Sequence, residues 1–366
     1  MCRGISRRAQ QDSRFVEFAE VLAAEALSVA DCMSDETDTL YIGGGTPSVL
    51  PLAAFRTLLD ALRQAGHGGP YKEFTVEVNP EDIVEKGIPY VEGLLEMGVN
   101  RISMGVQSFD DDVLKFMNRR HDAVTARKAY ALLEDAGVGN ISIDLIFGLP
   151  QLSDKKWNDT LKRALEISPS GRLPEHVSSY QLSVDPESRL ASLLENGQWA
   201  EAPDELCERQ YDILCSTLRQ AGYSHYEISN FARPGFEAVH NSAYWHHVPY
   251  VGLGPGAHSF LSDGSGYMRR WNRPDLDAYM AAGLSGDFSP VREGEILTSD
   301  QIAMEKIMLA LRTSKGISES YLRMHSGHDA VEAAMKHGSL VSAGDGRLRI
   351  PESRFFVSDA LIAELV

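Results

Sequence analysis

The sequence predicts an α/β fold in which parallel strands alternate with amphipathic helices. Apolar, strand-like segments recur at intervals of roughly 30 residues, the length of the strand–helix unit in parallel sheets and barrels. Segments with apolar residues at three- and four-residue steps occupy the intervals. Polar residues gather where the strand-like segments end. In parallel sheets and barrels that edge is where ligands bind, so a shared site along one rim is expected.

The elements follow in a regular order. A helix is expected from Asp12 to about Ala30, before the first strand. The predicted strands are TLYIGG from Thr39, EFTVEVNP from Glu73, RISMGVQS from Arg101, ISIDLIFGLP from Ile141 and VSSYQLS from Val177. Two of the helices between them read LAAFRTLLDALRQAG and TARKAYALLEDAG. The second stops at Gly137, a residue type that commonly ends helices.

The pattern changes in the last half of the chain. A helical stretch runs to Gly222, and a segment dense in aromatic residues, histidines and glycines follows it. A helix is expected from about Ser299, then a small hairpin and a final helix. We therefore expect two domains, a barrel with an extension over residues 1–290 and a small winged-helix-like domain over residues 297–366.

Composition excludes several classes of function. The chain has 366 residues and a net charge of −17, which argues against nucleic acid as the main partner because phosphate binding needs a basic face. No apolar run approaches the roughly 18 residues of a transmembrane helix, although a peripheral membrane contact stays open. The cysteines are sparse and form no closely spaced pair: Cys2, Cys32, Cys207 and Cys215. That usage is typical of a reducing cytoplasm.

The segment YIGGGTPSVL, Tyr41–Leu50, places three glycines at the end of a strand. Consecutive glycines allow positive φ angles or a very close approach of the backbone to another group. Two interpretations follow. The segment is either a tight strand-to-helix turn or a bare backbone that contacts a small ligand.

Five motifs, taken together, resemble one known family. They are GGGTPS, VEVNPED, RISMGVQSFDDDVLKFMNRRH, IDLIFGLP and YEISNFARPGFEAVHN. They are similar to the radical S-adenosylmethionine (SAM) family of oxygen-independent coproporphyrinogen III oxidases and their heme-chaperone relatives, from about Thr39 to Tyr279. The resemblance implies an incomplete (β/α)6 partial barrel that lacks the family's first strand and cysteine loop, with a small, mostly helical C-terminal domain.

The resemblance also implies a SAM site at the strand ends. Residues that match the family's SAM contacts are Gly44, Gly45, Thr46, Glu77, Gln107, Arg119 and Asp144. SAM carries an ammonium group, a carboxylate and ribose hydroxyls, which suit acids, an amide and an arginine.

Each polar member of this set has a purely structural alternative. Glu77 could be a surface carboxylate, Gln107 a helix cap and Arg119 a solvated helix end. Asp144 is harder to explain in that way, because it stands between Ile143 and Leu145 in an apolar strand. A buried acid needs a partner, so Asp144 is the firmest of these predictions.

A second motif, HNSAYW over His240–Trp245, is similar to one in the heme-chaperone branch. The resemblance makes His240 a candidate heme ligand, because imidazole is a common axial ligand and aromatic residues suit a flat macrocycle. The alternative is that the ring nitrogens of His240 only cap a loop. A zinc site formed by His246, His247 and His258 is disfavoured, since adjacent histidines on a strand point in different directions.

The family's defining cysteines are absent. Its members hold a [4Fe–4S] cluster with a Cys-x-x-x-Cys-x-x-Cys loop, and this sequence contains no such trio. Cys2 stands about where the last of the three would fall. Either the chain is truncated at its N-terminus or the cluster has been lost. The missing edge strand favours truncation, because an exposed strand edge promotes aggregation.

The sequence therefore predicts a cytoplasmic heme chaperone. It would bind heme and pass it to an acceptor protein, with SAM and the cluster in supporting roles in the intact form. The alternative is the oxidase, which decarboxylates porphyrinogen propionates by a 5′-deoxyadenosyl radical. A third reading is a cluster-less, non-enzymatic heme-binding remnant. The HNSAYW motif favours the chaperone, and the chain as it stands is not expected to perform radical chemistry.

Overall fold

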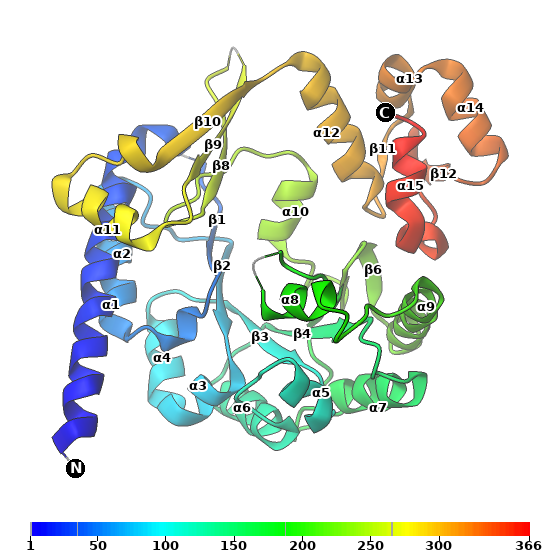
Figure 1. The fold of residues 1–366 in the computed structure, drawn as a ribbon. Coiled ribbons are helices and arrows are strands. Elements are labelled where there is room, and N and C mark those ends of the chain that lie inside the picture. The colour runs from blue at the N-terminus through cyan, green and yellow to red at the C-terminus, as the bar shows by residue number, and fades with distance from the viewer. Residues whose placement is uncertain (1, 35, 187, 265) are drawn as a thin grey trace. The chain divides into compact units, whose positions relative to one another are not determined.

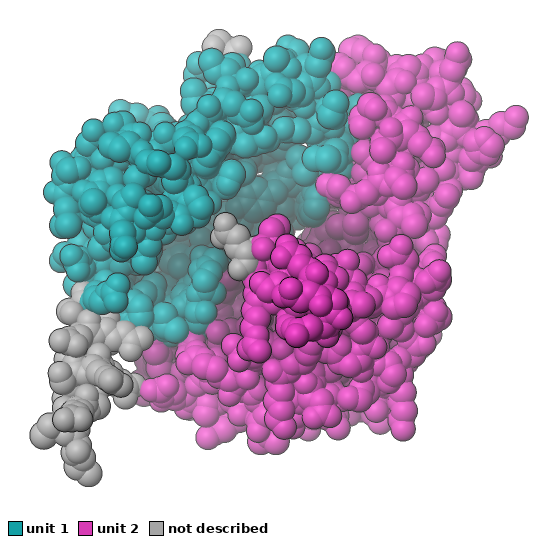
Figure 2. Space-filling view, in the orientation of Figure 1, with its two compact units in different colours: residues 1–74, 93–99, 239–309 teal, residues 75–92, 100–238, 310–366 magenta. Residues whose placement is uncertain are grey.

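The structure is a computed structural model that describes residues 2–34, 36–186, 188–264 and 266–366, with the backbone alone for residues 2–13. The chain forms two compact units, coloured separately in Figure 2. Unit 1 comprises Met1–Phe74, Gly93–Val99 and Val239–Leu309, and unit 2 comprises Thr75–Glu92, Asn100–Ala238 and Ala310–Val366. Among the described residues, none of the helices has both the length and the apolar character that crossing a membrane requires.

The main sheet has seven strands in the order β1-β2-β3-β4-β5-β7-β6. Their bounds are β1 Thr39–Ile42, β2 Glu73–Val78, β3 Arg101–Gln107, β4 Ile141–Phe147, β5 His176–Gln181, β6 Ser224–Glu227 and β7 Asn230–Ala232. Strands β2 to β5 pair in parallel, whereas β7 runs antiparallel to both β5 and β6. The predicted α/β fold with parallel strands is confirmed, and the short antiparallel β6–β7 pair adds to it.

Helices of unit 2 occupy the predicted intervals between the strands. They are α3 Pro80–Lys86, α5 Asp111–Phe116, α6 Ala123–Asp135, α7 Asp154–Leu165, α8 Arg189–Glu195 and α9 Asp204–Gln220, and α4 Ile88–Glu96 spans both units. Figure 1 shows α6 and α7 on the same side of β3 and β4. The side chains of Asp122 and Ser153 cap α6 and α7 by accepting backbone N–H bonds. Gly137 follows the end of α6 at φ 88°, as predicted.

Unit 1 contains the long first helix and a second sheet. Its helices are α1 Cys2–Ser28, α2 Leu52–Gln64, α10 Val239–Trp245 and α11 Leu276–Ser285. Its antiparallel sheet has the order β10-β9-β8, formed by β8 His258–Ser262, β9 Tyr267–Asn272 and β10 Arg292–Leu297. The buried carboxylate of Glu25 on α1 accepts bonds from the Gly254 N–H (2.8 Å), the Asn272 side chain (2.7 Å) and the Tyr279 hydroxyl (2.6 Å).

The C-terminal segment follows α12 Ser299–Leu311. It contains a three-stranded sheet of order β11-β13-β12, in which β12 and β13 form the expected hairpin. The expected final helix follows the sheet. Its elements, orange to red in Figure 1, are β11 Ile317–Ser318, α13 Glu319–Ser326, α14 His328–Lys336, β12 Val341–Gly344, β13 Arg347–Arg349 and α15 Ser358–Ala363. The division into domains at residues 290 and 297 stays a prediction.

Candidate functional site

The glycine run after β1 lies in unit 1 and adopts a left-handed backbone. Gly44 has φ 74° and Gly45 has φ 65°, angles that residues with a β-carbon rarely adopt. A β-carbon built on either glycine meets no atom of the described structure within 4 Å. Conformation rather than crowding therefore explains glycine here, and the space beside this exposed backbone is open. Thr46 follows at φ −145°, where the short helix Pro47–Val49 begins.

The other predicted SAM-binding residues lie in unit 2. Glu77 is on β2, Gln107 ends β3, Asp144 is on β4, and Arg119 follows α5. Glu77 and Ser103 are register partners on neighbouring strands, as are Asp144 and Ser178. Because register partners in a parallel sheet point to the same face, these strands present a continuous polar strip on one face.

Asp144 is held by hydroxyl groups rather than by an ion pair. The Ser103 hydroxyl lies 3.1 and 3.2 Å from its two carboxylate oxygens. The pKa of Asp144 is raised to about 6, chiefly by burial and to a lesser extent by the nearby Glu77 carboxylate. The Ser178 hydroxyl, the Arg101 charge and the Ser103 hydroxyl act in the opposite direction. Asp144 therefore has a partner, as the sequence required, and its charge depends on pH near neutrality.

Gln107 is one of the few non-glycine residues with a positive φ, 64°. Its side-chain nitrogen would lie 2.9 Å from a β-carbon at Gly105, and the Asn79 side-chain oxygen would lie 3.3 Å from the same point. The Gln107 amide is therefore folded back over Gly105 towards the end of β2. A glycine at position 105 is what makes this arrangement possible.

Arg119 lies within electrostatic reach of Asp144. Burial lowers the pKa of Arg119, while the carboxylates of Glu81 and Asp144 raise it. The two residues that follow Arg119 are fixed to the start of α3. Arg120 pairs with Glu81 at 3.0 Å, and His121 contacts the Glu81 carboxylate at 3.1 Å and the Val106 carbonyl at 3.0 Å. The segment that carries Arg119 is thus firmly positioned.

A second polar layer lies deeper in unit 2. His176 is fully buried, and its ring nitrogens contact the Ser142 hydroxyl at 2.8 Å and the Tyr226 hydroxyl at 2.7 Å. Burial lowers the pKa of His176 well below its usual value, and the Arg101 charge lowers it further. The ring therefore stays neutral and serves as a hydrogen-bonding link between β4, β5 and β6.

The sequence analysis did not single out Ser103, Ser178 or His121. The sequence pattern around Ser103 could have indicated this residue. In β3, RISMGVQ, every second residue is polar or glycine, which marks one face of a strand. His121 and its partner Glu81 lie 40 residues apart in the chain, and no local pattern indicates such a contact.

His240 lies on α10 in unit 1, where three side chains hold its ring. Its Nδ1 atom is 2.8 Å from the Thr39 hydroxyl, and its Nε2 atom is 2.8 Å from the Tyr244 hydroxyl. The ring stacks on Tyr41 with centroids 5.0 Å apart and planes at 19°. The buried Glu73 carboxylate accepts the backbone N–H groups of Val239 and His240 at 2.6 and 3.3 Å. These contacts fix the position of the imidazole.

Tyr244 also forms part of the wall of a cavity of about 450 Å³ in unit 1. Most of the wall is apolar or aromatic. It is lined by Tyr244, His247, Val248, Tyr250, Phe260, Arg269, Glu305, Met308 and Leu309. At its polar side, Glu305 contacts His247 at 3.0 Å and Arg269 at 2.6 Å. Glu305 thus joins His247 and Arg269, whereas the buried His247 Nδ1 atom has no hydrogen-bond partner among the described residues.

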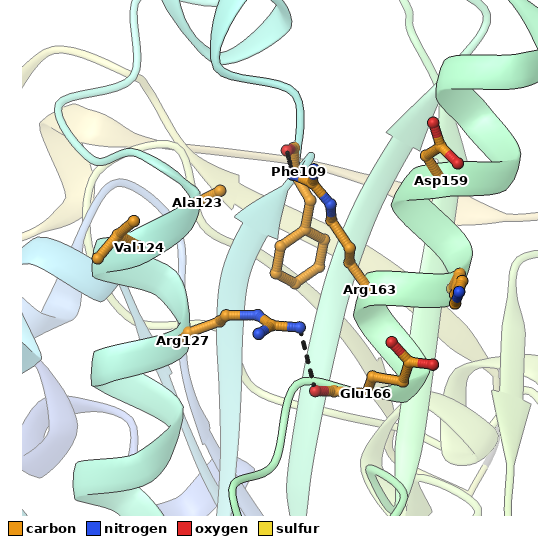
Figure 3. A pocket seen from close by; sticks show the side chains of 8 residues that line it. Phe109, Ala123, Val124, Arg127, Asp159, Arg163 and Glu166 are labelled. Carbon is orange, nitrogen blue, oxygen red and sulfur yellow. Dashed lines mark hydrogen bonds between the residues drawn. The ribbon is translucent and has the colours of Figure 1, made fainter.

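A groove of about 490 Å³ lies in unit 2 between α6 and α7 (Figure 3). Figure 3 shows Arg127 and Arg163 reaching into it from the two helices. Arg127 donates to the Glu166 carbonyl at 3.3 Å, and Arg163 donates to the Phe109 carbonyl at 2.8 Å. Through these hydrogen bonds, Arg127 links α6 to the end of α7, and Arg163 links α7 to the segment after β3. The residues that line the groove include none of those predicted to bind SAM or heme.

The described cysteines do not fit an iron–sulfur cluster. Cys32 is exposed in unit 1, whereas Cys207 and Cys215 are buried on α9 in unit 2. From residue 14 onward, positions 35, 187 and 265 apart, no group of three His, Cys, Asp or Glu side chains is placed to hold a metal ion. The predicted role of Cys2 concerns a side chain outside the described residues.

Comparison with known proteins identifies the family. The family profile of the Radical SAM superfamily matches residues 8–164. The "Heme chaperone HemW" of Bacillus subtilis (strain 168) is 32% identical over 83% of this chain and 77% of its own length. The "Heme chaperone HemW" of Mycobacterium tuberculosis (strain ATCC 25618 / H37Rv) is 32% identical over 93% of this chain and 83% of its own length.

A solved structure shows the same fold. The coproporphyrinogen III oxidase (HemN) of Escherichia coli, described as a radical SAM enzyme, superposes with a TM-score of 0.76. The match covers 97% of this chain and 84% of that one at 21% identity. The predicted radical SAM partial barrel and the resemblance drawn from the five motifs are both confirmed. The chain belongs to the HemW-like family of radical SAM proteins.

Proposed function

We propose that this chain is a heme chaperone, which binds heme and passes it to an acceptor protein. The observation that carries the proposal is the setting of His240 within HNSAYW. A half-buried imidazole is held by Thr39, Tyr41 and Tyr244, and two relatives that match 83% and 93% of the chain are named heme chaperones. The sparse, scattered cysteines support a cytoplasmic site of action.

The contacts of His240 suit a ligand for heme iron. Metal-binding histidines usually donate one ring N–H to a neighbouring oxygen, which fixes the ring and leaves the other nitrogen for the metal. Here Nδ1 can donate to the Thr39 hydroxyl. Nε2 then carries the lone pair that iron requires. The stacking on Tyr41 keeps the ring from turning away.

The polar strip of unit 2 supports SAM as a second ligand. It presents carboxylates at Glu77 and Asp144, a positive charge at Arg119 and an amide at Gln107, which match the ammonium, carboxylate and hydroxyl groups of SAM. Reductive cleavage of SAM would supply a radical only beside an iron–sulfur cluster. Because the described residues do not fit that cluster, no such step is assigned to them.

The oxidase alternative rests on fold alone, since the oxidase structure is 21% identical to this chain. Incubation of the chain with coproporphyrinogen III, SAM and a reductant tests the oxidase directly, and carbon dioxide released from the propionates would establish it. A lack of carbon dioxide is expected of any chain without a cluster, so the chaperone is tested by heme binding instead. Measured binding of SAM, weakened by Asp144→Asn, would in turn exclude the third reading, a remnant without a SAM site.

The direct test is heme binding by His240→Ala. The variant should bind hemin at least about tenfold more weakly or with a shifted Soret band, because the iron loses its axial nitrogen. His246→Ala is the matched control. His246 is exposed on the same stretch of chain, and among the described residues its ring hydrogen-bonds to the Ser242 carbonyl alone. Unchanged affinity and spectrum in His240→Ala would rule out this residue as the ligand.

A further inference from the structure

Tyr244 connects the proposed heme ligand with the neighbouring cavity. Its hydroxyl lies 2.8 Å from His240 Nε2, and the two rings meet edge to face with centroids 4.9 Å apart. Its side chain also forms part of the 450 Å³ cavity wall. One side chain thus contacts both the nitrogen that would bind iron and a space large enough to receive a side chain.

The hydroxyl occupies the place that iron would need. A nitrogen–metal bond is about 2.0–2.1 Å long, and iron cannot reach Nε2 while an oxygen lies 2.8 Å away along the same lone pair. The Tyr244 hydroxyl can donate its proton to Nε2, because a phenol O–H is a hydrogen-bond donor and the unprotonated ring nitrogen is an acceptor. With Nδ1 bonded to Thr39, both ring nitrogens are engaged in this structure.

The cavity gives the phenol ring an apolar place to move. Tyr244 already meets Tyr250 edge to face, with centroids 4.7 Å apart and planes at 84°. Beyond Tyr250 the wall is formed by Phe260, Met308 and Leu309. A ring that turns inward would therefore keep aromatic and aliphatic contacts when it leaves His240.

We propose that Tyr244 is a displaceable cap on the nitrogen through which His240 binds heme iron, and that its ring turns into the cavity when iron takes its place. This inference rests on the proposed function of the chain. Displacement exchanges one hydrogen bond for one iron–nitrogen bond, without transfer of an electron. The cap keeps His240 in the iron-binding orientation before heme arrives and makes bound heme easier to release, because the hydroxyl competes with iron for the nitrogen.

The first experiment compares Tyr244→Phe with Tyr250→Phe in the full chain. Both variants remove one hydroxyl from the same cavity wall, but only the first hydroxyl contacts His240. Hemin affinity and association rate are followed by the Soret band. Loss of the cap should make hemin binding about two- to tenfold tighter, the range expected for one hydrogen bond, with Tyr250→Phe within about twofold of wild type. Equal or weaker binding by Tyr244→Phe would overturn the inference.

The second experiment fills the cavity with Met308→Trp. Hemin association should slow in the wild-type background, where the Tyr244 ring has to enter the cavity. It should be unaffected in a Tyr244→Ala background, where no ring moves. Circular dichroism and urea unfolding confirm that each variant is folded. Equal slowing in both backgrounds would contradict the role of the cavity.

The outcomes separate the inference from the function on which it rests. If His240→Ala binds hemin with the wild-type spectrum, His240 is not the ligand, and both the heme site and its cap are overturned. If His240→Ala loses the axial ligand but Tyr244→Phe binds hemin like the wild type, the heme site stands and only the cap is overturned.

Discussion

Gly105 determines where the Gln107 side chain lies. The two residues are on the same face of β3, and the Gln107 amide occupies the space that a side chain at position 105 would fill. Gly44 and Gly45 differ from Gly105, because open space surrounds them and only their positive φ angles favour glycine. Glycine is thus required at position 105 for space and at positions 44 and 45 for backbone conformation. A matched pair of alanine variants can separate these two requirements.

Gly105→Ala should weaken SAM binding, because the new β-carbon lies 2.9 Å from the Gln107 nitrogen and displaces the amide. Gly45→Ala should in addition reduce the free energy of unfolding by about 1–2 kcal/mol, because residue 45 has a left-handed backbone. Isothermal titration with SAM and urea unfolding measure the two effects. SAM affinity equal to wild type in Gly105→Ala would show that Gln107 does not contact SAM.

Single residues were predictable where the local sequence was unusual. Asp144 stood out as an acid between two apolar neighbours, and the structure shows its raised pKa and its serine partner. The environment of His240 was not predictable in this way. Its contact with Thr39 joins residues 201 positions apart, and such pairs depend on the completed fold rather than on local pattern.

At the scale of elements, the β6–β7 pair carries a buried acid that forms no ion pair among the described residues. Glu227 is fully buried at the end of β6, and one of its carboxylate oxygens accepts the Ser229 N–H at 3.1 Å. Its other oxygen has no hydrogen-bond partner among the described residues. Burial raises the pKa of Glu227 to about 7, against the opposing effect of the bonds from Ser229 and Asn230.

Glu227→Gln should stabilise the protein at alkaline pH. The folded state holds the proton of Glu227 up to a pKa of about 7, above the ordinary 4.5, so the wild type loses stability as pH rises through this window. Glutamine stays neutral, and its advantage should grow from near zero at pH 4 to at most about 3 kcal/mol at pH 8. Urea unfolding of both proteins at pH 4 and pH 8 measures this advantage in the free energy of unfolding. An advantage that is the same at both pH values would contradict a raised pKa of buried Glu227 as its cause.

The periodicity of apolar residues predicted which segments are helices or strands more readily than it predicted which strands pair with one another. The amphipathic steps and caps of α2 and α6, and the apolar runs of β3 and β4, are local properties of the sequence. The antiparallel β6–β7 pair was not predicted from the sequence, because its strands have only four and three residues. So few residues carry too short an alternation to distinguish a strand from a loop.

At the scale of the whole molecule, the family's fold is present, whereas the described side chains include no group placed to hold its cluster. The chain superposes on the oxidase over 97% of its length, yet its described cysteines are dispersed over both units. The fold was predictable because five motifs occur in order along the sequence. The division of the chain into two compact units was not predictable, because unit 1 is assembled from three separate segments of the sequence.

Anaerobic reconstitution of this 366-residue chain should leave iron and sulfide far below the four of each that a [4Fe–4S] cluster contains, because three closely spaced thiolates are needed. Cys2→Ser should leave that low content unchanged. Iron and sulfide assays together with the visible spectrum give the result. Close to four irons and four sulfides per chain would show that other residues assemble the cluster.

The Glu25 network has a consequence for the order in which the protein is made. Its carboxylate on α1 joins the Gly254 N–H and the Tyr279 hydroxyl, which follow it by 229 and 254 residues. At a synthesis rate of about 5–20 residues per second, these partners leave the ribosome roughly 10–50 s after α1. Most of unit 2 is translated in that interval. Helix α1 therefore reaches these contacts only after the partners of Glu25 have been made, and its packing depends on residues far later in the chain.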